Sequence, residues 1–501
     1  MGLIGKMADK VRNGIRSFLE IQPAPAGTIY INEKLDYESN AIKNKIWYRG
    51  QSDELSQLYK SIDADRTLFW KAVPTPGRAI RKIHTGLPAN IVDMLVSIVM
   101  SDMNSINVSE KQEEWELIAK DNNFEAVMTK ALTQTLVVGD GAFKFTINTT
   151  ISPYPLIEFI SGENIEYVYQ HGRISRIIFK TVYRYNHRTY LLEETYVKNG
   201  ICSHLYANGN EVPLNSLPMT EGLQESVTWE GGFMMAVPFK IYDSNKWEGR
   251  GKSVFDSKCD SFDALDEVWS QWLEALRRGR SKEYIPASLC PRNPDTGEII
   301  KPNDFDNQYL RVEGSLSEDG KDKVELIQPE IPHESYLSTY VTALDLCLQG
   351  LISPSTLGID VKKLDNAEAQ REKEKATLYT RNKIVETIQH SLPEVVNTAI
   401  QTYEVLTMQA VTSHTVEIPF GEYANPSFES QVETISKGKQ GGIMSIEASV
   451  EELYGDSKDE EWKQQEVMRL KAEQGIETME QASVSEDNGG FVVDKVQDIP
   501  K

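Results

Sequence analysis

The stretch GKSVFDSKCDSFDALDEVWSQWLEALRRGRSKEYI, residues 251–285, does most to decide the fold of this 501-residue chain. Its apolar residues recur every three or four positions, a spacing that places them on one face of a helix. They are Phe255, Cys259, Phe262, Leu265, Trp269, Trp272 and Leu276. We expect a helix of about seven turns over residues 253–281. On its exposed side, acidic residues (Asp260, Asp263, Asp266 and Glu267) precede a basic cluster of Arg277, Arg278, Arg280 and Lys282, and cations near a helix C-terminus suit the helix dipole.

A second apolar helix is expected over residues 331–349, where Tyr336, Tyr340, Leu344 and Leu348 are in register. The residues between the two helices, 282–330, show turn signals and short strand patterns and predict a small α/β insert. Two such helices cannot bury their apolar faces against each other alone. We therefore expect a second copy of the chain to cover them, because a heterologous contact repeated around an axis closes a ring. The predicted interface residues are Phe262, Trp269, Trp272, Tyr336, Tyr340 and Leu344; the alternative is a monomer whose helices fold back on its own body.

A Gly/Ser/Pro loop at residues 350–366 follows the second helix and is locally basic in an otherwise acidic chain. Gly350, Pro354 and Gly358 allow such a loop to shift, and Lys362 and Lys363 are adjacent in it. The next helix is expected to begin after Asp365, with Glu368 completing a capping box. It should be kinked or divided at Pro393.

The rest of the chain predicts an α+β protein. Residues 53–135 show helical periodicity. Residues 140–207 read as a β-meander whose hairpin turns carry His171-Gly172, Asn199-Gly200 and Asn208-Gly209. The stretch LVVGDGAF resembles an acidic site at the end of a strand, but Gly139-Asp140-Gly141 is interpreted as a further hairpin turn. Acidic helices are expected across about residues 427–475, and the polar tail from Gln481 is expected to be disordered.

Composition narrows the function classes. A net charge of -22 argues against a general binder of nucleic acid or of anionic membranes. It does not exclude DNA as a transient partner. The four cysteines, Cys202, Cys259, Cys290 and Cys347, lack metal-ligand spacing and predict reduced core thiols in a cytosolic setting. The seven histidines are scattered, and no catalytic motif accompanies them. No metal and no cofactor is expected, and catalysis is not favoured.

The first twenty residues, MGLIGKMADKVRNGIRSFLE, form a basic amphipathic pattern with one apolar face: Ile4, Met7, Val11, Ile15 and Phe18. The pattern lacks the continuous apolar run of a signal peptide. We favour a helix that packs on its own protein or on a neighbour. The alternative is a helix that lies on a membrane, but no stable membrane association is expected.

The motif GRGKS, residues 249–253, resembles a phosphate-binding loop because it follows a strand and opens a helix. The full motif needs a glycine five positions before Gly251, and that position is Lys246. A capping box formed by Ser253 and Asp256 explains the serine without a nucleotide. A nucleotide- or phosphate-dependent enzyme is therefore kept as the alternative function.

These elements, in this order, resemble the portal proteins of tailed bacteriophages, especially those of long-tailed phages of Gram-positive hosts. The resemblance covers roughly residues 40–475 and is carried by TGLPANIVDMLVSIVM, GDGAFKFTINTTISPYPLIEFISGENIEYVYQHGRISRIIF, GKSVFDSKCDSFDALDEVW, GLISPSTLGID and NAEAQREKEKATLYTRNKI. It implies a ring, usually dodecameric, at one vertex of the capsid in the virion, assembled in the host cytoplasm. Double-stranded DNA would pass through the ring during packaging and ejection.

Carried over by position, the resemblance implies a division of the chain into portal domains. Residues 1–39 form the N-terminal segment, 40–252 with 367–425 the wing, 253–281 and 331–349 the stem, 282–330 the clip, 350–366 the tunnel loop, 426–480 the crown and 481–501 a tail. Lys362, Lys363, Ser353 and Ser355 would face DNA in the tunnel loop, and the basic cluster at the stem–clip junction is a second candidate contact. The implied partners are the terminase large subunit, which would supply the ATP-driven work, a head-completion or adaptor protein, and the major capsid and scaffold proteins.

Overall fold

The computed structural model describes residues 33–62, 66–75, 80–286, 289–300, 309–312, 325–328, 330–359, 367–421, 428–454 and 460–473. The N-terminal amphipathic pattern, Lys362, Lys363, the cap at Asp365 and the tail from Gln481 lie outside these ranges. The chain divides into two compact units, residues 1–421 and 422–501, and each is considered by itself.

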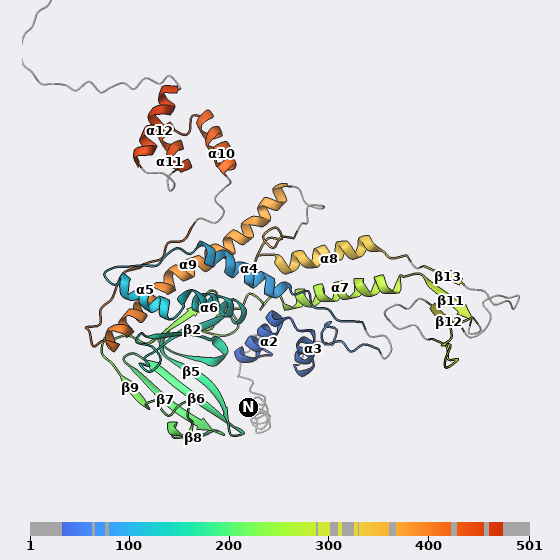
Figure 1. Ribbon diagram of the computed structural model, residues 1–501, viewed down its shortest axis with the longest axis horizontal. Coiled ribbons are helices and arrows are strands. Elements are labelled where there is room, and N and C mark those ends of the chain that lie inside the picture. The colour runs from blue at the N-terminus through green and yellow to red at the C-terminus, as the bar shows by residue number, and fades with distance from the viewer. Residues whose placement is uncertain are drawn as a thin grey trace, which may run out of the picture. The chain divides into compact units, whose positions relative to one another are not determined.

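The first unit begins with a group of helices (Figure 1). They are α2 (Tyr37–Arg49), α3 (Ser52–Ser61), α4 (Leu87–Asp102), α5 (Gln112–Asp121) and α6 (Phe124–Val138). Asp36 caps α2 by accepting a hydrogen bond from the Ser39 N–H at 2.7 Å. Helix α4 buries Ile91, Val92 and Leu95 completely. That burial explains why α4 is apolar over most of its surface rather than along one stripe.

Two antiparallel sheets follow these helices. Strand β2 (Asp140–Thr146) lies between β3 (Leu156–Ser161) and β10 (Ala236–Lys240). The larger sheet is the expected meander: β4 (Ile165–Gln170), β5 (Arg173–Tyr185), β6 (Arg188–Val197), β7 (Gly200–Ala207) and β8 (Asn210–Val212), with β9 (Ser226–Thr228) paired to β7. Short 3-10 helices, η1 (Gly162–Asn164) and η2 (Leu214–Ser216), connect strands. His171, Asn199 and Asn208 have φ of 51°, 63° and 51°, as tight hairpin turns require.

The interpretation of Gly139-Asp140-Gly141 as a hairpin turn is wrong. Gly139 ends helix α6 and Asp140 begins β2, so the segment joins a helix to a strand. Asp140 is completely buried, and its carboxylate accepts hydrogen bonds from the Arg250 guanidinium at 2.8 and 3.0 Å. A Cβ at Gly139 would lie 2.5 Å from the Gly251 carbonyl oxygen, which explains the need for glycine.

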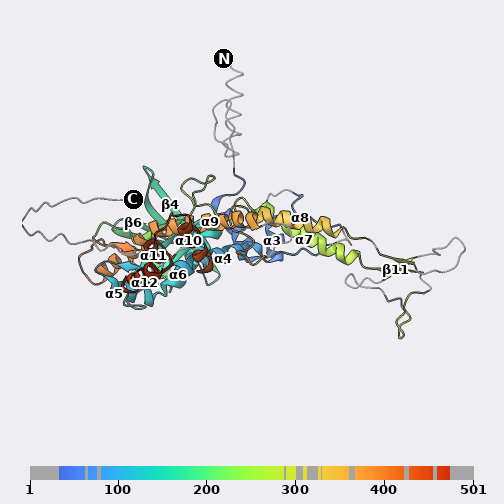
Figure 2. The ribbon, with the colours of Figure 1, turned by 90° about the horizontal axis from the view of Figure 1, so that it is seen from above.

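Helix α7 (Cys259–Arg278) and helix α8 (His333–Leu348) run side by side (Figures 1 and 2). A small sheet follows α7, in which β11 (Lys282–Pro286) pairs in parallel with β12 (Tyr309–Val312) and antiparallel with β13 (Glu325–Ile327). The sequence prediction started α7 too early, because turns occupy residues 254–258. The capping contact is nevertheless present: Asp256 accepts from the Ser253 N–H at 2.9 Å.

Helix α9 (Ala367–Leu406) continues through Pro393, so of the two predicted outcomes, a kink or a division, the division does not occur. Leu392, Val395 and Val396 around the proline are completely buried. Their packing offsets the backbone hydrogen bond that proline cannot donate. After α9, β14 (Val416–Glu417) pairs with β1 (Asn107–Val108).

The second unit contains α10 (Phe428–Gln440), α11 (Ile446–Tyr454) and α12 (Glu460–Glu473). Tyr454 and Trp462 contact each other edge to face at 5.0 Å between ring centroids. The predicted α+β fold class is confirmed. Among the helices that the structure describes, none is both long and apolar enough to cross a membrane.

Candidate functional site

The aromatic residues predicted to form an interface lie between α7 and α8 of the same chain. Trp272 stacks on Tyr336, with 6.2 Å between ring centroids and 9° between ring planes. Trp269 contacts Tyr340 at 5.7 Å. All four side chains are only partly buried. The two helices therefore cover part of each other's apolar surface, which the sequence argument had assigned to a neighbouring subunit.

Phe262 and Leu344 are covered more completely by their own chain. Phe262 is 1% exposed and contacts Trp47 and Phe255, each at 5.9 Å between centroids. Leu344 is 4% exposed. These two residues belong to the core of the subunit, so their burial needs no neighbour, and the interface proposal below does not use them.

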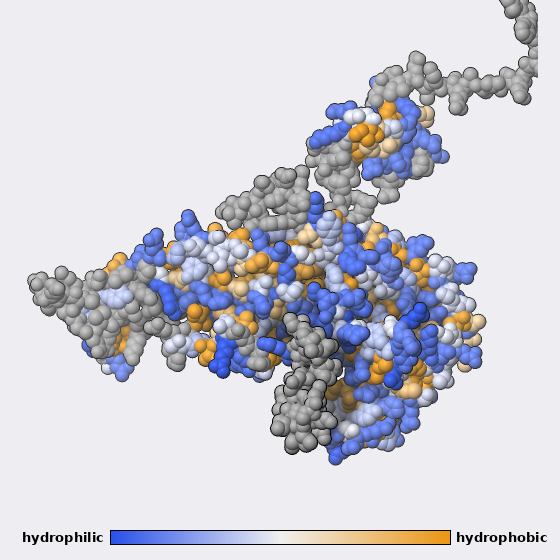
Figure 3. All heavy atoms as spheres, turned by 180° about the vertical axis from the view of Figure 1, so that it is seen from behind, coloured by the Kyte–Doolittle hydropathy of each residue, from blue (hydrophilic) through white to orange (hydrophobic). Residues whose placement is uncertain are grey.

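Other apolar side chains on the helix pair stay open to solvent. Leu276 on α7 and Leu337 and Leu346 on α8 are 45%, 47% and 52% exposed. Figure 3 shows hydrophobic side chains exposed among hydrophilic ones along this projecting part of the unit. Leu337 and Leu346 lie off the Tyr336–Leu348 stripe, so a search for one stripe misses them. We call these three leucines together the exposed apolar surface of the helix pair, although Leu337 and Leu346, nine residues apart, lie on roughly opposite sides of α8.

The acidic residues early in α7, expected on an exposed face, are partly buried. Asp263 and Asp266 are 4% and 0% exposed. Both fasten a segment that we call the strap, residues 66–75 and 80–86. The Asp263 carboxylate accepts hydrogen bonds from the Phe69 N–H at 2.8 Å and the Trp70 N–H at 3.1 Å. Burial raises the pKa of Asp263, an effect that these two donors oppose.

Asp266 holds the other half of the strap. Its carboxylate accepts hydrogen bonds from the Thr85 N–H at 2.9 Å, the Thr85 hydroxyl at 3.0 Å and the Trp70 indole N–H at 3.2 Å. His84 Nδ1 lies 2.7 Å from the same carboxylate. The carboxylates of Asp263 and Asp266 thus fix the strap to the first half of α7. Sequence periodicity does not reveal this role.

The described part of the tunnel-loop candidate, residues 350–359, forms a folded turn. Ser353 is 1% exposed, and its N–H donates to the Thr377 hydroxyl of α9 at 2.8 Å. The Ser353 hydroxyl lies 2.9 Å from that of Ser355 and 2.7 Å from that of Thr356. Ser353, which was predicted to face DNA, is enclosed by these neighbours in the subunit, and Ser355 is partly buried.

The basic candidates are only partly described. Lys362 and Lys363 lie outside the described residues, and so does the side chain of Lys282. The Arg278 guanidinium donates to the Glu274 carboxylate at 2.8 Å, as expected for an i,i+4 pair near a helix end. Arg277 is partly buried, and Arg280 is exposed. The Arg278–Glu274 pair fits the helix-end role that the sequence allowed for this basic cluster.

The backbone donors of the GKS part of the loop, residues 251–253, are already engaged. The N–H of Gly251 donates to Asp140 at 2.6 Å, and that of Lys252 donates to the Tyr242 carbonyl at 2.8 Å. The Ser253 N–H donates to Asp256, and the Ser253 hydroxyl to the Val137 carbonyl at 2.6 Å. A phosphate-binding loop works by aiming free N–H groups at the anion. These contacts remove the basis of the enzyme alternative.

The cysteines are reduced in the structure, and none forms a disulfide. Burial raises the pKa of the Cys259 thiol to about 11 and that of Cys347 to about 12. Thiols with such pKa values are poor nucleophiles at neutral pH. Within the described residues, no group of three His, Cys, Asp or Glu side chains is placed to hold a metal ion.

The first unit combines a helical body, a β-meander, a projecting helix pair and a small sheet after the first helix of that pair (Figure 1). The sequence model described as "Phage portal protein, SPP1 Gp6-like" matches residues 29–478. The chain therefore belongs to the SPP1 Gp6-like family of phage portal proteins. No curated protein matches the chain.

Several solved structures resemble the chain, and two of them illustrate how weak the similarity is. One is titled "Neck of native GTA particle computed with C12 symmetry", with a TM-score of 0.37, 10% identity, and coverage of 73% of this chain and 89% of that chain. The other is titled "Neck of empty GTA particle computed with C6 symmetry", with a TM-score of 0.36, 12% identity, and coverage of 76% and 89%.

Proposed function

We propose that this portal protein assembles into a closed ring, a dodecamer, at one capsid vertex of the virion. Double-stranded DNA enters the capsid through the ring during packaging and leaves through it on infection. The chain itself is a passive conduit and docking platform, and a separate terminase supplies the ATP-driven work. Membership of a portal family and the engaged backbone donors of residues 251–253 both support a role without catalysis.

The observation that carries the ring is the exposed apolar surface of the helix pair, Leu276, Leu337 and Leu346. Each leucine leaves about half of its surface in water, so covering it contributes about half of the roughly 1.5–3 kcal/mol that complete burial of such a side chain gives. A heterologous contact between the helix pair of one subunit and that of the next covers these leucines and closes around an axis.

We assign the parts of the ring as follows. Residues 40–252 with 367–425 are the wing, α7 and α8 the stem, residues 282–330 the clip that docks the terminase and later the head-completion protein, and residues 426–480 the crown. Capsid and scaffold proteins contact the outside of the ring.

The tunnel loop is residues 350–366, and its DNA contacts are Lys362 and Lys363. Repeated around the axis, these lysines form a narrow cationic collar in a chain of net charge -22. Screening confines the attraction to about 10 Å, so the collar holds DNA without fixing it along the channel.

Negative-stain imaging of the purified protein tests the ring. We expect rings with a central hole. Leu337→Asp/Leu346→Asp should abolish them, while Leu117→Asp, a matched change at a 48% exposed leucine of α5, should leave them intact. If the double variant still forms rings, the assigned stem contact is wrong.

Lys362→Ala/Lys363→Ala tests the collar separately. This variant should assemble normally and package or retain less DNA. Unchanged packaging and retention would refute the DNA role of the loop and leave the ring proposal standing.

A further inference from the structure

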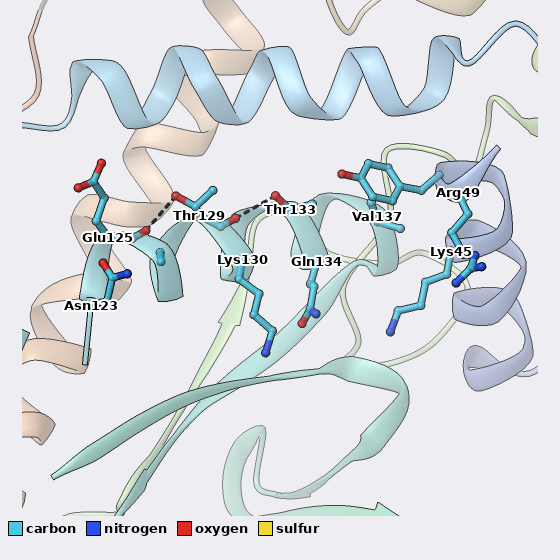
Figure 4. Close-up of a pocket in the computed structure, with 11 residues that line it drawn as sticks. Lys45, Arg49, Asn123, Glu125, Thr129, Lys130, Thr133, Gln134 and Val137 are labelled. Atoms are coloured by element: carbon cyan, nitrogen blue, oxygen red, sulfur yellow. Dashed lines mark hydrogen bonds between the residues drawn. The ribbon is translucent and has the colours of Figure 1, made fainter. Parts of the chain in front are cut away.

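A long groove runs along the exposed side of α6. Its first part, a hollow of about 660 Å³, is lined by the end of α2 and by one face of α6. Figure 4 shows Lys130 and Gln134 of α6 and Lys45 of α2 extending along the same side of this hollow. Tyr48 and Val137 form the apolar part of its floor.

The groove continues beyond the first turn of α6. A second hollow of about 550 Å³ shares the lining residues Asn123 and Glu125 with the first, so the two hollows are neighbours at the first turn of α6. Met100, Met103, Ile106, Trp115 and Phe124 line this part, contributed by α4, α5, the start of α6 and the segment between α4 and α5. Methionine side chains adapt to the shape of a partner and are common at surfaces that bind amphipathic helices.

Two of the three cations that line the first hollow are paired within the chain. Lys45 forms an ion pair with Glu163, and Arg49 with Glu54. Glu125 is exposed where the two hollows meet, between Lys120 and Lys130 along the chain. A partner therefore gains most from the apolar floor, and its cations can reach Glu125 while the rest of its charged face points to water.

A segment of this chain outside the described residues matches the groove in pattern and in length. Residues 4–18 carry Ile4, Met7, Val11, Ile15 and Phe18 at helical spacing. A helix of this length is about 22 Å long, as is α6 with its 15 residues.

The connection to the described chain is also long enough. Residues 19–32 extend at most about 46 Å. The distance that they need to cover runs from the start of α2 to its far end, which lines the groove. Helix α2 has 13 residues, so this distance is about 20 Å. The segment can therefore reach the groove of its own subunit.

We propose that residues 4–18 dock as an amphipathic helix in the groove along α6 of the same chain, with the apolar face on the methionine-lined floor. Docking covers the apolar face that would otherwise favour a membrane surface. Because the contact forms within one chain, it does not depend on ring assembly, and its failure leaves the proposed function untouched.

Limited trypsin digestion of the full chain tests the proposal, since Lys6, Lys10, Arg12 and Arg16 are cleavage sites within the segment. Ala126→Trp places an indole in the groove from an exposed position of α6. We expect cleavage at the four sites to be about tenfold faster in this variant, because proteolysis follows the population of the undocked segment. The matched control Ala264→Trp, at an exposed alanine of α7, should digest like the unaltered protein.

A second substitution shows whether segment and groove act on each other. Ile15→Asp should speed cleavage by a similar factor, and adding Ala126→Trp should give little further increase, because each change already breaks the same contact. Equal cleavage rates in Ala126→Trp and the unaltered protein, or effects that multiply in the double variant, would overturn the proposal.

Vesicles of phosphatidylglycerol and phosphatidylcholine in equal parts test the membrane alternative. The full chain should remain with the unbound protein in a flotation gradient. Flotation that Ile15→Asp abolishes would show that the segment prefers a lipid surface and would also overturn the proposal.

Discussion

Substitution of Asp266 by alanine should release the strap from the stem helix. The Asp266 carboxylate is completely buried and serves Thr85 twice, Trp70 once and His84 once. Alanine removes the acceptor and leaves these donors without their partner inside the protein. We expect the effect to be local first, because the rest of α7 still packs against the core.

The magnitude follows from the hydrogen bonds that alanine removes. A buried donor deprived of its acceptor costs about 1–3 kcal/mol, and hydrogen bonds to a charged group lie at the upper end. Water will reach some of the freed donors, so the contributions do not add fully. We expect the free energy needed to open the strap locally to fall by about 3–4 kcal/mol. This fall lowers the protection factor against hydrogen exchange by roughly two to three powers of ten.

Amide hydrogen exchange measures this loss. Exchange at the Thr85 amide and the Trp70 indole N–H, which both donate to Asp266, should speed up by about that factor in Asp266→Ala, while amides of β2 and β3 stay unchanged. Gln271→Ala, at an exposed residue of the same helix, is the control. Exchange in the strap that changes less than threefold would refute the inference that Asp266 fixes it to α7.

Three further predictions concern other parts of the chain. Thr377→Val removes the acceptor of the Ser353 N–H, so exchange at that amide should rise about tenfold or more; an unchanged rate would show that the hydroxyl does not hold the loop. The Lys471 ammonium, which donates to the Glu447 carboxylate, is the largest cause that lowers the pKa of Glu447 to about 2. Because this pKa is below the ordinary value of 4.5, the ion pair stabilises the second unit above about pH 4.5, and this stabilisation is lost as the pH falls through 2. An NMR titration of Glu447 measures the pKa. A midpoint above 4, or a midpoint that Lys471→Ala does not change, would contradict this prediction. Lys252→Ala should leave ring assembly and DNA packaging unchanged, and a nucleotide affinity that this substitution abolished would revive the enzyme alternative.

Local patterns predicted much of the fold. Alternation and Asn-Gly or His-Gly turns were enough for the meander, because hairpin registers are set by neighbouring residues. The three-and-four spacing of apolar residues was enough for α7 and α8. The rule that an interior proline can divide a helix failed where tertiary packing overrides it, as at Pro393, where completely buried side chains hold α9 together.

The candidate site was less accessible to sequence reasoning. Aspartates in a helix usually indicate a solvated face, yet Asp263 and Asp266 bind backbone donors almost 200 residues earlier in the chain. No local pattern records such a contact. Likewise, an apolar stripe shows that Phe262 and Trp272 are covered, but not whether the same chain or a neighbour covers them.

The mass of the purified particle tests the central claim most directly, because the proposed ring forms when sister subunits cover the exposed leucines of the helix pair. Light scattering coupled to size exclusion should give about twelve times 56.6 kDa. A single species of 56.6 kDa that stays folded at high concentration would contradict the ring and with it the proposed channel.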